Sequence, residues 1–468
     1  MKSFLIFSGL YGLTTAILKI VGFVLFLWLA KVLSVAEFAQ FGILLAIQQG
    51  IVSFGNAGVI ETTIGKLKEN QNSQEKEQLY KDSLGAFILL TTTVSIIGLL
   101  TFFFTVGNID TYQTYTVVIL SGLLLGLVSF RSQLYRINET HSWAVFYSFF
   151  PPFGGVIVAG ICVLFFKTIS SFFFGTVIGV LIPLMILELI GNNQQKLSFN
   201  NKKTLNILTN SIPYLLIAIL SWLSGYGNNY IIKAFFSSEE VAKYTFLLSL
   251  CSIMLMLASA LNQVWGPRFL KLINKLPFDE VENRSKIFFL ILNHLLGILG
   301  GFVVLIYPLF INFIGGNVLF YQNLNLELSL MFTTYILSTP WWHCYNHFLS
   351  QGLGSSLLSI SIASSTVGLF SMILLMWIFG PIGIFIGFPI QILIRSLWII
   401  YFSQKKWKID ISWIGITTGI LIIFLGLFIS IINIPYFISI PIFLAISTST
   451  IFLRAKYYSE IFTKLEIK

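Results

Sequence analysis

Long apolar runs separated by short polar segments dominate the chain and predict its elements. An apolar helix needs about 20 residues to cross the hydrocarbon core of a bilayer, and about fourteen runs are long enough. They cover residues 3–30, 38–60, 83–106, 115–134, 143–166, 170–190, 205–236, 241–264, 287–314, 328–349, 357–379, 382–402, 411–432 and 435–453. The pattern therefore predicts an all-α integral membrane protein with about fourteen transmembrane helices.

A short phrase occurs twice at the same place in this pattern. Ser-Val-Ala-Glu-Phe-Ala-Gln-Phe at residues 34–41 corresponds to Ser-Ser-Glu-Glu-Val-Ala-Lys-Tyr at residues 237–244, and each follows an apolar run that ends near Lys31 or Lys233. A period of roughly 200 residues indicates an internal repeat of two membrane lobes. Since each repeat holds an even number of spans, we expect the lobes to be parallel, related by an axis along the membrane normal.

A polar junction at residues 191–203 predicts the boundary between the lobes. We expect an N-terminal lobe of spans one to six at residues 1–198 and a C-terminal lobe of spans seven to twelve at residues 199–404. Residues 405–468 hold the last two spans and a cytoplasmic tail.

Composition and charge agree with a membrane protein. The 468 residues have a mean hydropathy of +0.88 and only 10% are charged, too few to cover a soluble fold. If both termini are cytoplasmic, 23 of the 28 Lys and Arg residues lie on cytoplasmic loops, as the positive-inside rule requires. Of the other five, Lys19 lies within the membrane, and the four on the outer side are Lys31, Lys167, Lys233 and Lys243. The net charge of +10 thus faces anionic lipid headgroups and indicates no nucleic-acid partner.

The first span carries one polar stripe, at intervals of four, three, four and three residues, formed by Ser8, Gly12, Thr15, Lys19 and Gly22. A charge near mid-bilayer costs about 2.5 to 3.5 kcal/mol on insertion scales, so it normally faces a watery cavity. Thr15 and Lys19 are therefore candidate substrate-binding residues. The alternative is that Lys19 snorkels or pairs locally with a carbonyl.

Polar residues on the second and seventh spans extend the candidate site. Gln49 and Asn56 share a face of the second span, although such residues also serve as hydrogen-bonding glue between helices. The seventh span carries a Ser-, Gly- and Asn-rich run at residues 221–229, which predicts a break in the helix where backbone lines a cavity. Ser221 and Asn228 from this run are further candidates.

Acidic residues are confined to the ends of spans, as Glu61, Glu188 and Glu327 illustrate. A site for organic cations would need a carboxylate at depth to offset desolvation of the substrate. The pattern therefore favours an anionic substrate.

His343 and His347 lie one helical turn apart on the tenth span. No neighbouring Glu completes a zinc-binding motif and no third ligand is evident, so no metal site is predicted. Aromatic packing and a proton or sugar contact are the alternatives, and His343 is kept as a candidate substrate contact. Arg395 is another candidate, which lies near enough to a span end to snorkel.

Several segments together resemble the Wzx-type polysaccharide-biosynthesis flippases of the multidrug/oligosaccharidyl-lipid/polysaccharide exporter superfamily. They are residues 9–12, 30–42, 54–58, 130–136 and 380–387, and the likeness extends to the span count and lobe plan.

This resemblance implies a bacterial inner-membrane protein that moves an undecaprenyl-pyrophosphate-linked oligosaccharide from the cytoplasmic to the periplasmic leaflet. It implies two six-helix lobes around a cationic lumen, with the last two helices beside a groove for the lipid tail. Lys19 matches the position of a pyrophosphate-binding residue. Arg131 and Arg136 match the basic end of the fourth helix and are further candidate substrate-binding residues. Partners would be the bilayer and the polymerase and glycosyltransferases of the pathway. We expect a monomer without a cofactor. Whether transport is coupled to an ion, Na⁺ or H⁺, is left open.

Three other functions are alternatives to a polysaccharide-biosynthesis flippase. An ion-coupled multidrug exporter and a lipid II flippase share the fold, and the missing deep acidic residue argues against the exporter. From a different class, a membrane polysaccharide polymerase is disfavoured because outer loops are short and no acid, base or nucleophile cluster is evident. The expectation is that the protein is not an enzyme.

Overall fold

The fold is helical throughout the described residues. The computed structural model describes residues 2–56, 58–67, 73–106, 109–137, 140–190, 201–273, 275–351, 353–432 and 434–452, which form helices and turns without a β-strand. The chain divides into two compact units, Met1–Ala242 and Lys243–Lys468. The predicted polar junction falls largely on residues 191–200, outside the described residues, so the predicted lobe boundaries stay a prediction. The predicted cytoplasmic tail after residue 452 also lies outside the description.

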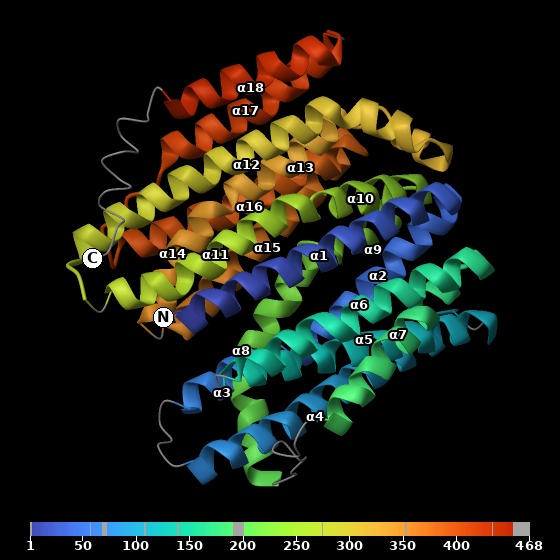
Figure 1. Ribbon diagram of the computed structural model, residues 1–468, viewed down its shortest axis with the longest axis vertical. Coiled ribbons are helices and arrows are strands. Elements are labelled where there is room, and N and C mark those ends of the chain that lie inside the picture. The colour runs from blue at the N-terminus through green and yellow to red at the C-terminus, as the bar shows by residue number, and fades with distance from the viewer. Residues whose placement is uncertain are drawn as a thin grey trace. The chain divides into compact units, whose positions relative to one another are not determined.

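The first unit is a bundle built on α2, α5, α6 and α7 (Figure 1). Its helices are α1 (Lys2–Val32), α2 (Val35–Asn56), α3 (Val59–Leu67), α4 (Ser73–Val106), α5 (Ile109–Ile137), α6 (His141–Phe166), α7 (Ile169–Ile190), α8 (Asn201–Leu223) and α9 (Asn228–Phe235). Helix α6 packs along α7, and α5 packs on both of them and on α2.

The second unit is organised around its longest helix, α12. Its elements are α10 (Ser238–Leu250), which contains the unit boundary, α11 (Ser252–Ile273), α12 (Phe278–Ile314), the 3₁₀ helix η1 (Gly316–Tyr321), α13 (Asn325–Leu337), α14 (Thr339–Ser350), α15 (Gly354–Phe379), α16 (Ile382–Gln404), α17 (Trp413–Ile431) and α18 (Tyr436–Phe452). Helices α17 and α18 lie beside α12, and α16 packs on α13, α14 and α15 (Figure 1).

Every predicted span corresponds to one helix or to two consecutive helices, which confirms the all-α membrane architecture. Eleven helices within the described residues are long and apolar enough to cross a membrane. The predicted break in the seventh span is confirmed, since α8 ends at Leu223 and α9 begins at Asn228. A break in the tenth span, between α13 and α14, was not predicted. It occurs at Ser338, two residues before Pro340, which has no N–H to continue the helical hydrogen bonding.

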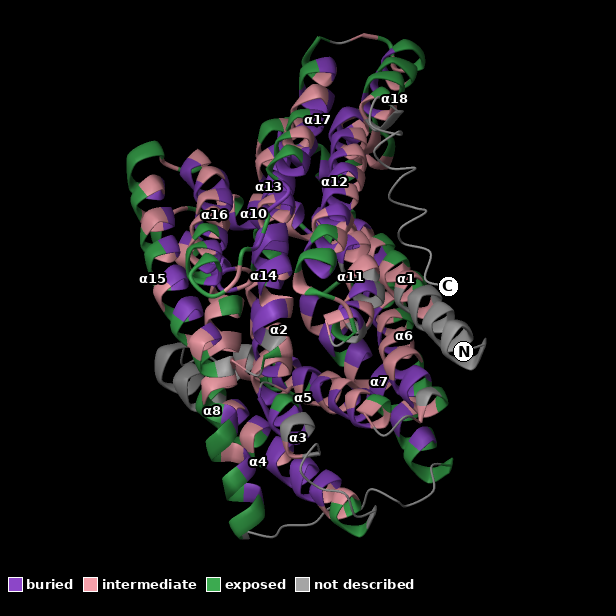
Figure 2. Cartoon of the chain, turned by 90° about the vertical axis from the view of Figure 1, so that its left-hand side faces the viewer, coloured by how far each residue is buried: buried purple, intermediate pink, exposed green. Residues whose placement is uncertain are grey.

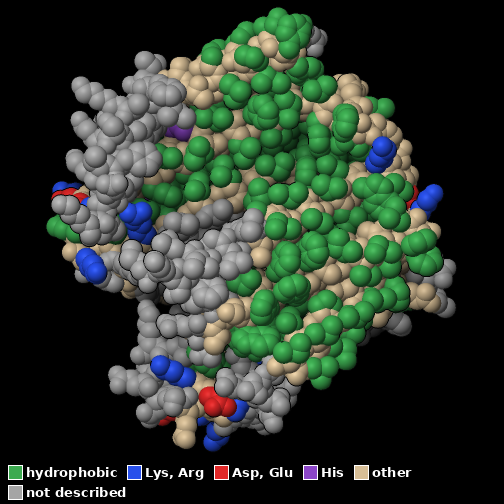
Figure 3. Space-filling model, viewed as in Figure 1, with side chains coloured by type: hydrophobic (Ala, Val, Ile, Leu, Met, Phe, Trp, Pro, Cys, Tyr) green, Lys and Arg blue, Asp and Glu red, His purple; other side chains and the backbone are tan. Residues whose placement is uncertain are grey.

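Large apolar side chains cover the outside of the helices. Phe313 is 88% exposed, Leu189 82% and Trp377 78%, values that a water-soluble surface would not support. Figure 2 shows exposed residues along the outer sides of the helices and buried residues where they pack. On the face in Figure 3, hydrophobic side chains form a broad surface and charged ones appear at its margins. This distribution fits a protein whose solvent is lipid.

Small residues let the most closely packed helix pairs approach backbone to backbone. Gly175 of α7 faces α6, where an added Cβ would lie 2.6 Å from the Cα of Ala159. Gly297 of α12 faces α17, where an added Cβ would lie 2.7 Å from the Cα of Gly419. Both glycines begin a Gly-x-x-x-Gly sequence, ending at Gly179 and Gly301, as is typical of membrane helix interfaces.

We predict that Gly175→Ala destabilises the first unit by about 1 to 3 kcal/mol, because backbone atoms of α6 cannot move aside as a flexible side chain would. Thermal unfolding of the purified protein in detergent should show a melting temperature several degrees below wild type. The matched control is Gly98→Ala on α4, where nothing lies within 4 Å of an added Cβ. Equal melting temperatures for the two variants would contradict the close approach of α6 and α7.

Candidate functional site

Lys19 lies at the middle of α1 and is half-buried. The exposed apolar face of this helix is marked by Ile17, Ile20 and Val24, which are three and four residues apart. Lys19 lies off that stripe, so its side chain does not share the lipid-facing side of α1. Thr15, the neighbouring candidate, has a side chain outside the described residues.

A cavity of about 280 Å³ opens beside this part of α1, within the first unit. Leu18 and Gly22, which flank Lys19 in the sequence, line it from α1, and Gln49 lines it from α2. Gln48 also lines it, with a buried Nε2 that donates to Ser121 Oγ at 2.8 Å. Most other lining residues are apolar. The structure thus brings Gln49 together with the segment that carries Lys19.

Asn56 is engaged in packing. Its Nδ2 donates to the carbonyl of Val52 at 2.8 Å and more weakly to that of Gly126 on α5 at 3.4 Å. These bonds match the alternative in which Asn56 acts as hydrogen-bonding glue between helices.

Arg131 is buried and forms an ion pair with Glu188, which is exposed, inside the first unit. Its Nε and Nη2 lie 3.0 and 3.1 Å from the two carboxylate oxygens of Glu188 on α7, and the Tyr147 hydroxyl donates to Glu188 at 3.0 Å. Helices α5, α6 and α7 therefore meet at one carboxylate. The geometry indicates a structural role for Arg131, while Arg136, in the last turn of α5, is exposed.

The break between α8 and α9 is fixed by side chains that reach α2. Trp222 Nε1 donates to the carbonyl of Ala46 at 2.8 Å, and Asn229 Nδ2 donates to that of Gly42 at 3.1 Å. Of the two candidates from this segment, Ser221 is exposed at the end of α8 and Asn228 is buried at the start of α9. The predicted irregular backbone is therefore packed against a neighbouring helix.

In the second unit, Arg395 lies on α16 with its guanidinium 3.9 Å from the centre of the Trp341 ring. A cation over an aromatic face at this distance is stabilised by the ring quadrupole. Arg395 thus has an aromatic partner on α14.

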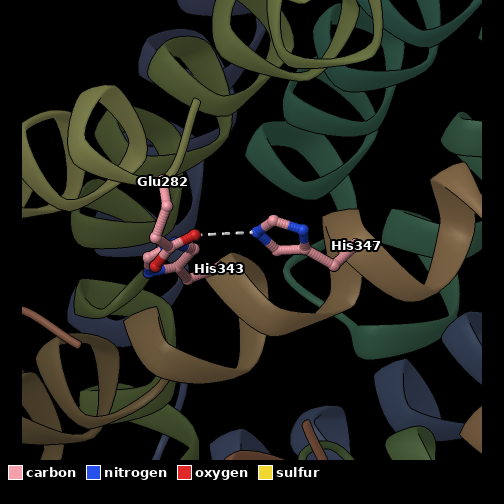
Figure 4. A group of neighbouring side chains, drawn as sticks. All are labelled: Glu282, His343 and His347. Carbon is pink, nitrogen blue, oxygen red and sulfur yellow. Dashed lines mark hydrogen bonds and ion pairs between the residues drawn. The ribbon is translucent and has the colours of Figure 1, made fainter. Parts of the chain in front are cut away.

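His343 and His347 point at a residue that the sequence did not reveal as their partner, Glu282 of α12 (Figure 4). The Nε2 of His347 lies 3.0 Å from Glu282 Oε2, and that of His343 lies 3.1 Å from Oε1 and 3.3 Å from Oε2. All three residues are buried, with exposed fractions of 1% for each histidine and 4% for the glutamate. A carboxylate from the second turn of a distant helix gives no local signal, and only the packing of α12 on α14 reveals it.

Aromatic rings and one backbone donor enclose this cluster. The Phe289 ring stacks on His343 with centroids 4.8 Å apart, and Phe269 meets the ring of His347 edge-on at the same distance. The backbone N–H of Asp410, in the segment before α17, donates to Glu282 Oε1 at 2.7 Å. The carboxylate therefore joins α12, α14 and the segment leading into α17.

The comparisons with known proteins agree on the fold. The model of a family described as polysaccharide biosynthesis protein matches residues 7–273. No curated protein matches the sequence.

Three solved structures illustrate the similarity. A lipid II flippase MurJ in an inward closed conformation is 15% identical, with a TM-score of 0.67, covering 97% of this chain and 99% of that one. An inward-facing multidrug resistance MATE family transporter of the MOP superfamily is 13% identical, with a TM-score of 0.63, covering 83% and 94%. The eukaryotic MATE transporter AtDTX14 is 12% identical, with a TM-score of 0.60, covering 89% and 97%.

We predict that Arg131→Gln lowers the stability of the first unit by roughly 1 kcal/mol, because the Glu188 carboxylate loses its charged hydrogen-bond partner but remains accessible to water. Adding Glu188→Gln should recover part of that loss, since two neutral amides replace a broken ion pair. Melting temperatures of the two single variants and the double variant measure this coupling. An Arg131→Gln protein that is as stable as wild type but inactive would instead return Arg131 to the substrate site.

Proposed function

The chain belongs to the polysaccharide biosynthesis protein family, and from this membership we propose that it is a flippase for a lipid-linked oligosaccharide. Its cargo would be an undecaprenyl-pyrophosphate-linked repeat unit of an O-antigen, capsule or exopolysaccharide. The protein would move this cargo from the cytoplasmic to the periplasmic leaflet of a bacterial inner membrane, without catalysing a chemical reaction.

The physical demands of such a cargo support the proposal. The polyprenyl chain can stay in lipid, whereas the pyrophosphate and sugars need a polar route because an unpaired charge in hydrocarbon is costly. Two membrane lobes that alternate between inward and outward openings meet both demands, and this mode of transport is known for repeat-built transporters. The similarity of fold to a lipid II flippase over nearly the whole chain fits the same idea.

Lys19 is the observation that carries the proposal. It is a half-buried cation at the middle of a helix, off the exposed apolar stripe, and its neighbours Leu18 and Gly22 line a cavity that Gln49 also lines. A lysine and a phosphate oxygen about 4 Å apart attract by roughly 4 kcal/mol at an effective dielectric of about 20. Lys19 would therefore contact the pyrophosphate, and Gln49 would offer hydrogen bonds to the cargo.

The remaining candidates have smaller parts in the proposal. Thr15, Ser221 and Asn228 would supply polar contacts, and Arg136 would attract the anionic headgroup at the cytoplasmic side. His343 and Arg395 have partners within the second unit, so we assign them no direct contact with the cargo. The driving force would be an ion gradient, with Na⁺ or H⁺ as the coupling ion.

We predict that Lys19→Ala abolishes surface polysaccharide while the amount of protein in the membrane stays at the wild-type level, because a positive charge at this position is what binds the pyrophosphate. Lys19→Arg should retain activity, as it keeps the charge. The measurement is surface glycan in a strain that carries each variant as its only copy, with immunoblots for protein level. Normal polysaccharide in Lys19→Ala would remove Lys19 from the site.

Deleting the gene should cause one lipid-linked oligosaccharide to accumulate on the cytoplasmic leaflet, where it is made. Extraction of lipid-linked sugars and mass spectrometry would identify the glycan, and the wild-type gene in trans should clear it. Accumulation of lipid II instead would favour the lipid II flippase. Unchanged lipid-linked sugars with increased sensitivity to cationic drugs would favour a multidrug exporter and contradict the proposal.

A further inference from the structure

A second site lies in the second unit, and nothing in its geometry depends on the proposed transport cargo. We propose that Glu282, His343 and His347 bind a divalent transition-metal ion, with zinc as the best match. Their three ligand atoms lie within 4.8 Å of one another, and all three side chains are buried.

The distances fit a common ion. Zinc binds imidazole nitrogen and carboxylate oxygen at about 2.0 to 2.2 Å, so in a tetrahedral site two ligand atoms are about 3.3 to 3.4 Å apart. Glu282 Oε2 lies 3.3 Å from His343 Nε2 and 3.0 Å from His347 Nε2. These two spacings are therefore close to the value for a tetrahedral site, and the three ligand atoms all lie within 4.8 Å of one another.

The donor set is one that zinc prefers. Two histidines at i and i+4 on α14 present the same ring nitrogen from one helical face, and a glutamate from another helix completes the set of three (Figure 4). The fourth position is left to water, as in zinc sites with three protein ligands. A divalent ion would also offset the negative charge of a carboxylate that is 4% exposed.

The surroundings orient these ligands. Glu282 Oε1 accepts the Asp410 N–H and lies 3.1 Å from His343 Nε2, while Oε2 lies 3.0 Å from His347 Nε2 and 3.3 Å from His343 Nε2. The rings of Phe289 and Phe269 restrict the rotation of His343 and His347. A hydrogen-bonded carboxylate and fixed imidazoles within an apolar shell are what an outer shell provides in metal sites.

The location gives the ion a structural task. Glu282 lies in the second turn of α12, two residues after the exposed Glu280. Bound there, the ion would clamp α12 to α14 and, through the Asp410 N–H, to the segment that leads into α17.

The test uses the full-length protein, purified in detergent and freed of metal by a chelator. Added Zn²⁺ should bind at one equivalent per chain and raise the melting temperature, because it binds the folded state. Added Co²⁺ should give the visible absorption bands of four-coordinate cobalt. A wild-type protein that shows no cobalt spectrum and no thermal shift with either ion overturns the proposal, whatever the variants do.

Variants locate the site. The His343→Gln/His347→Gln protein and the Glu282→Gln protein should lose the cobalt spectrum and the zinc-dependent thermal shift. The matched control, His294→Gln, removes a buried histidine from α12 whose Nδ1 lies 2.8 Å from the Leu290 carbonyl, and it should retain both signals. Undiminished binding in the double variant would show that the ion sits elsewhere and would overturn the assignment.

Discussion

Close approach between helices is the constraint on which this molecule depends. Within lipid, backbone groups have no water to bond with, so each span must be a helix that satisfies its own peptide groups. Lipid also offers no hydrophobic reason for helices to associate, which leaves van der Waals packing and a few polar contacts to hold them. The glycines of α7 and α12 make such close packing possible, because the absence of a side chain at Gly175 and Gly297 lets a neighbouring backbone come into contact.

Polar side chains inside the two units either hold helices together or lie where they can bind a ligand, because an unpaired polar group in lipid is costly. Arg131 pairs with the Glu188 carboxylate, Asn56 donates to backbone carbonyls, and Trp222 donates to a carbonyl on α2. Each therefore contributes to holding helices together. Lys19 differs from these residues. It lies at the middle of α1, off the exposed apolar stripe, and it forms no ion pair with a Glu or Asp among the described residues. The contrast between satisfied groups and this cation separates residues that build the fold from one suited to bind a ligand.

The sequence predicted most of the fold because span length and loop charge are strong local signals. It also predicted the break before Asn228, since Ser, Gly and Asn cluster there. It could not predict the pairing of Arg131 with Glu188 or of His347 with Glu282, because each pair joins residues on different helices and depends on how those helices turn toward one another. Arg131 was assigned to substrate on its position in the chain, and the packing of α5 on α7 suggests a different role.

The bond from Asp410 to Glu282 has a consequence for how the protein is made. Glu282 is synthesised 128 residues before its backbone donor, so α12 enters the membrane while one oxygen of this carboxylate still awaits its partner. The pairing can close only after residue 410 has been synthesised, in the segment that leads into α17, which packs along α12. A chain that ends before residue 410 would therefore lack this backbone donor as well as α17 and α18, which pack on α12.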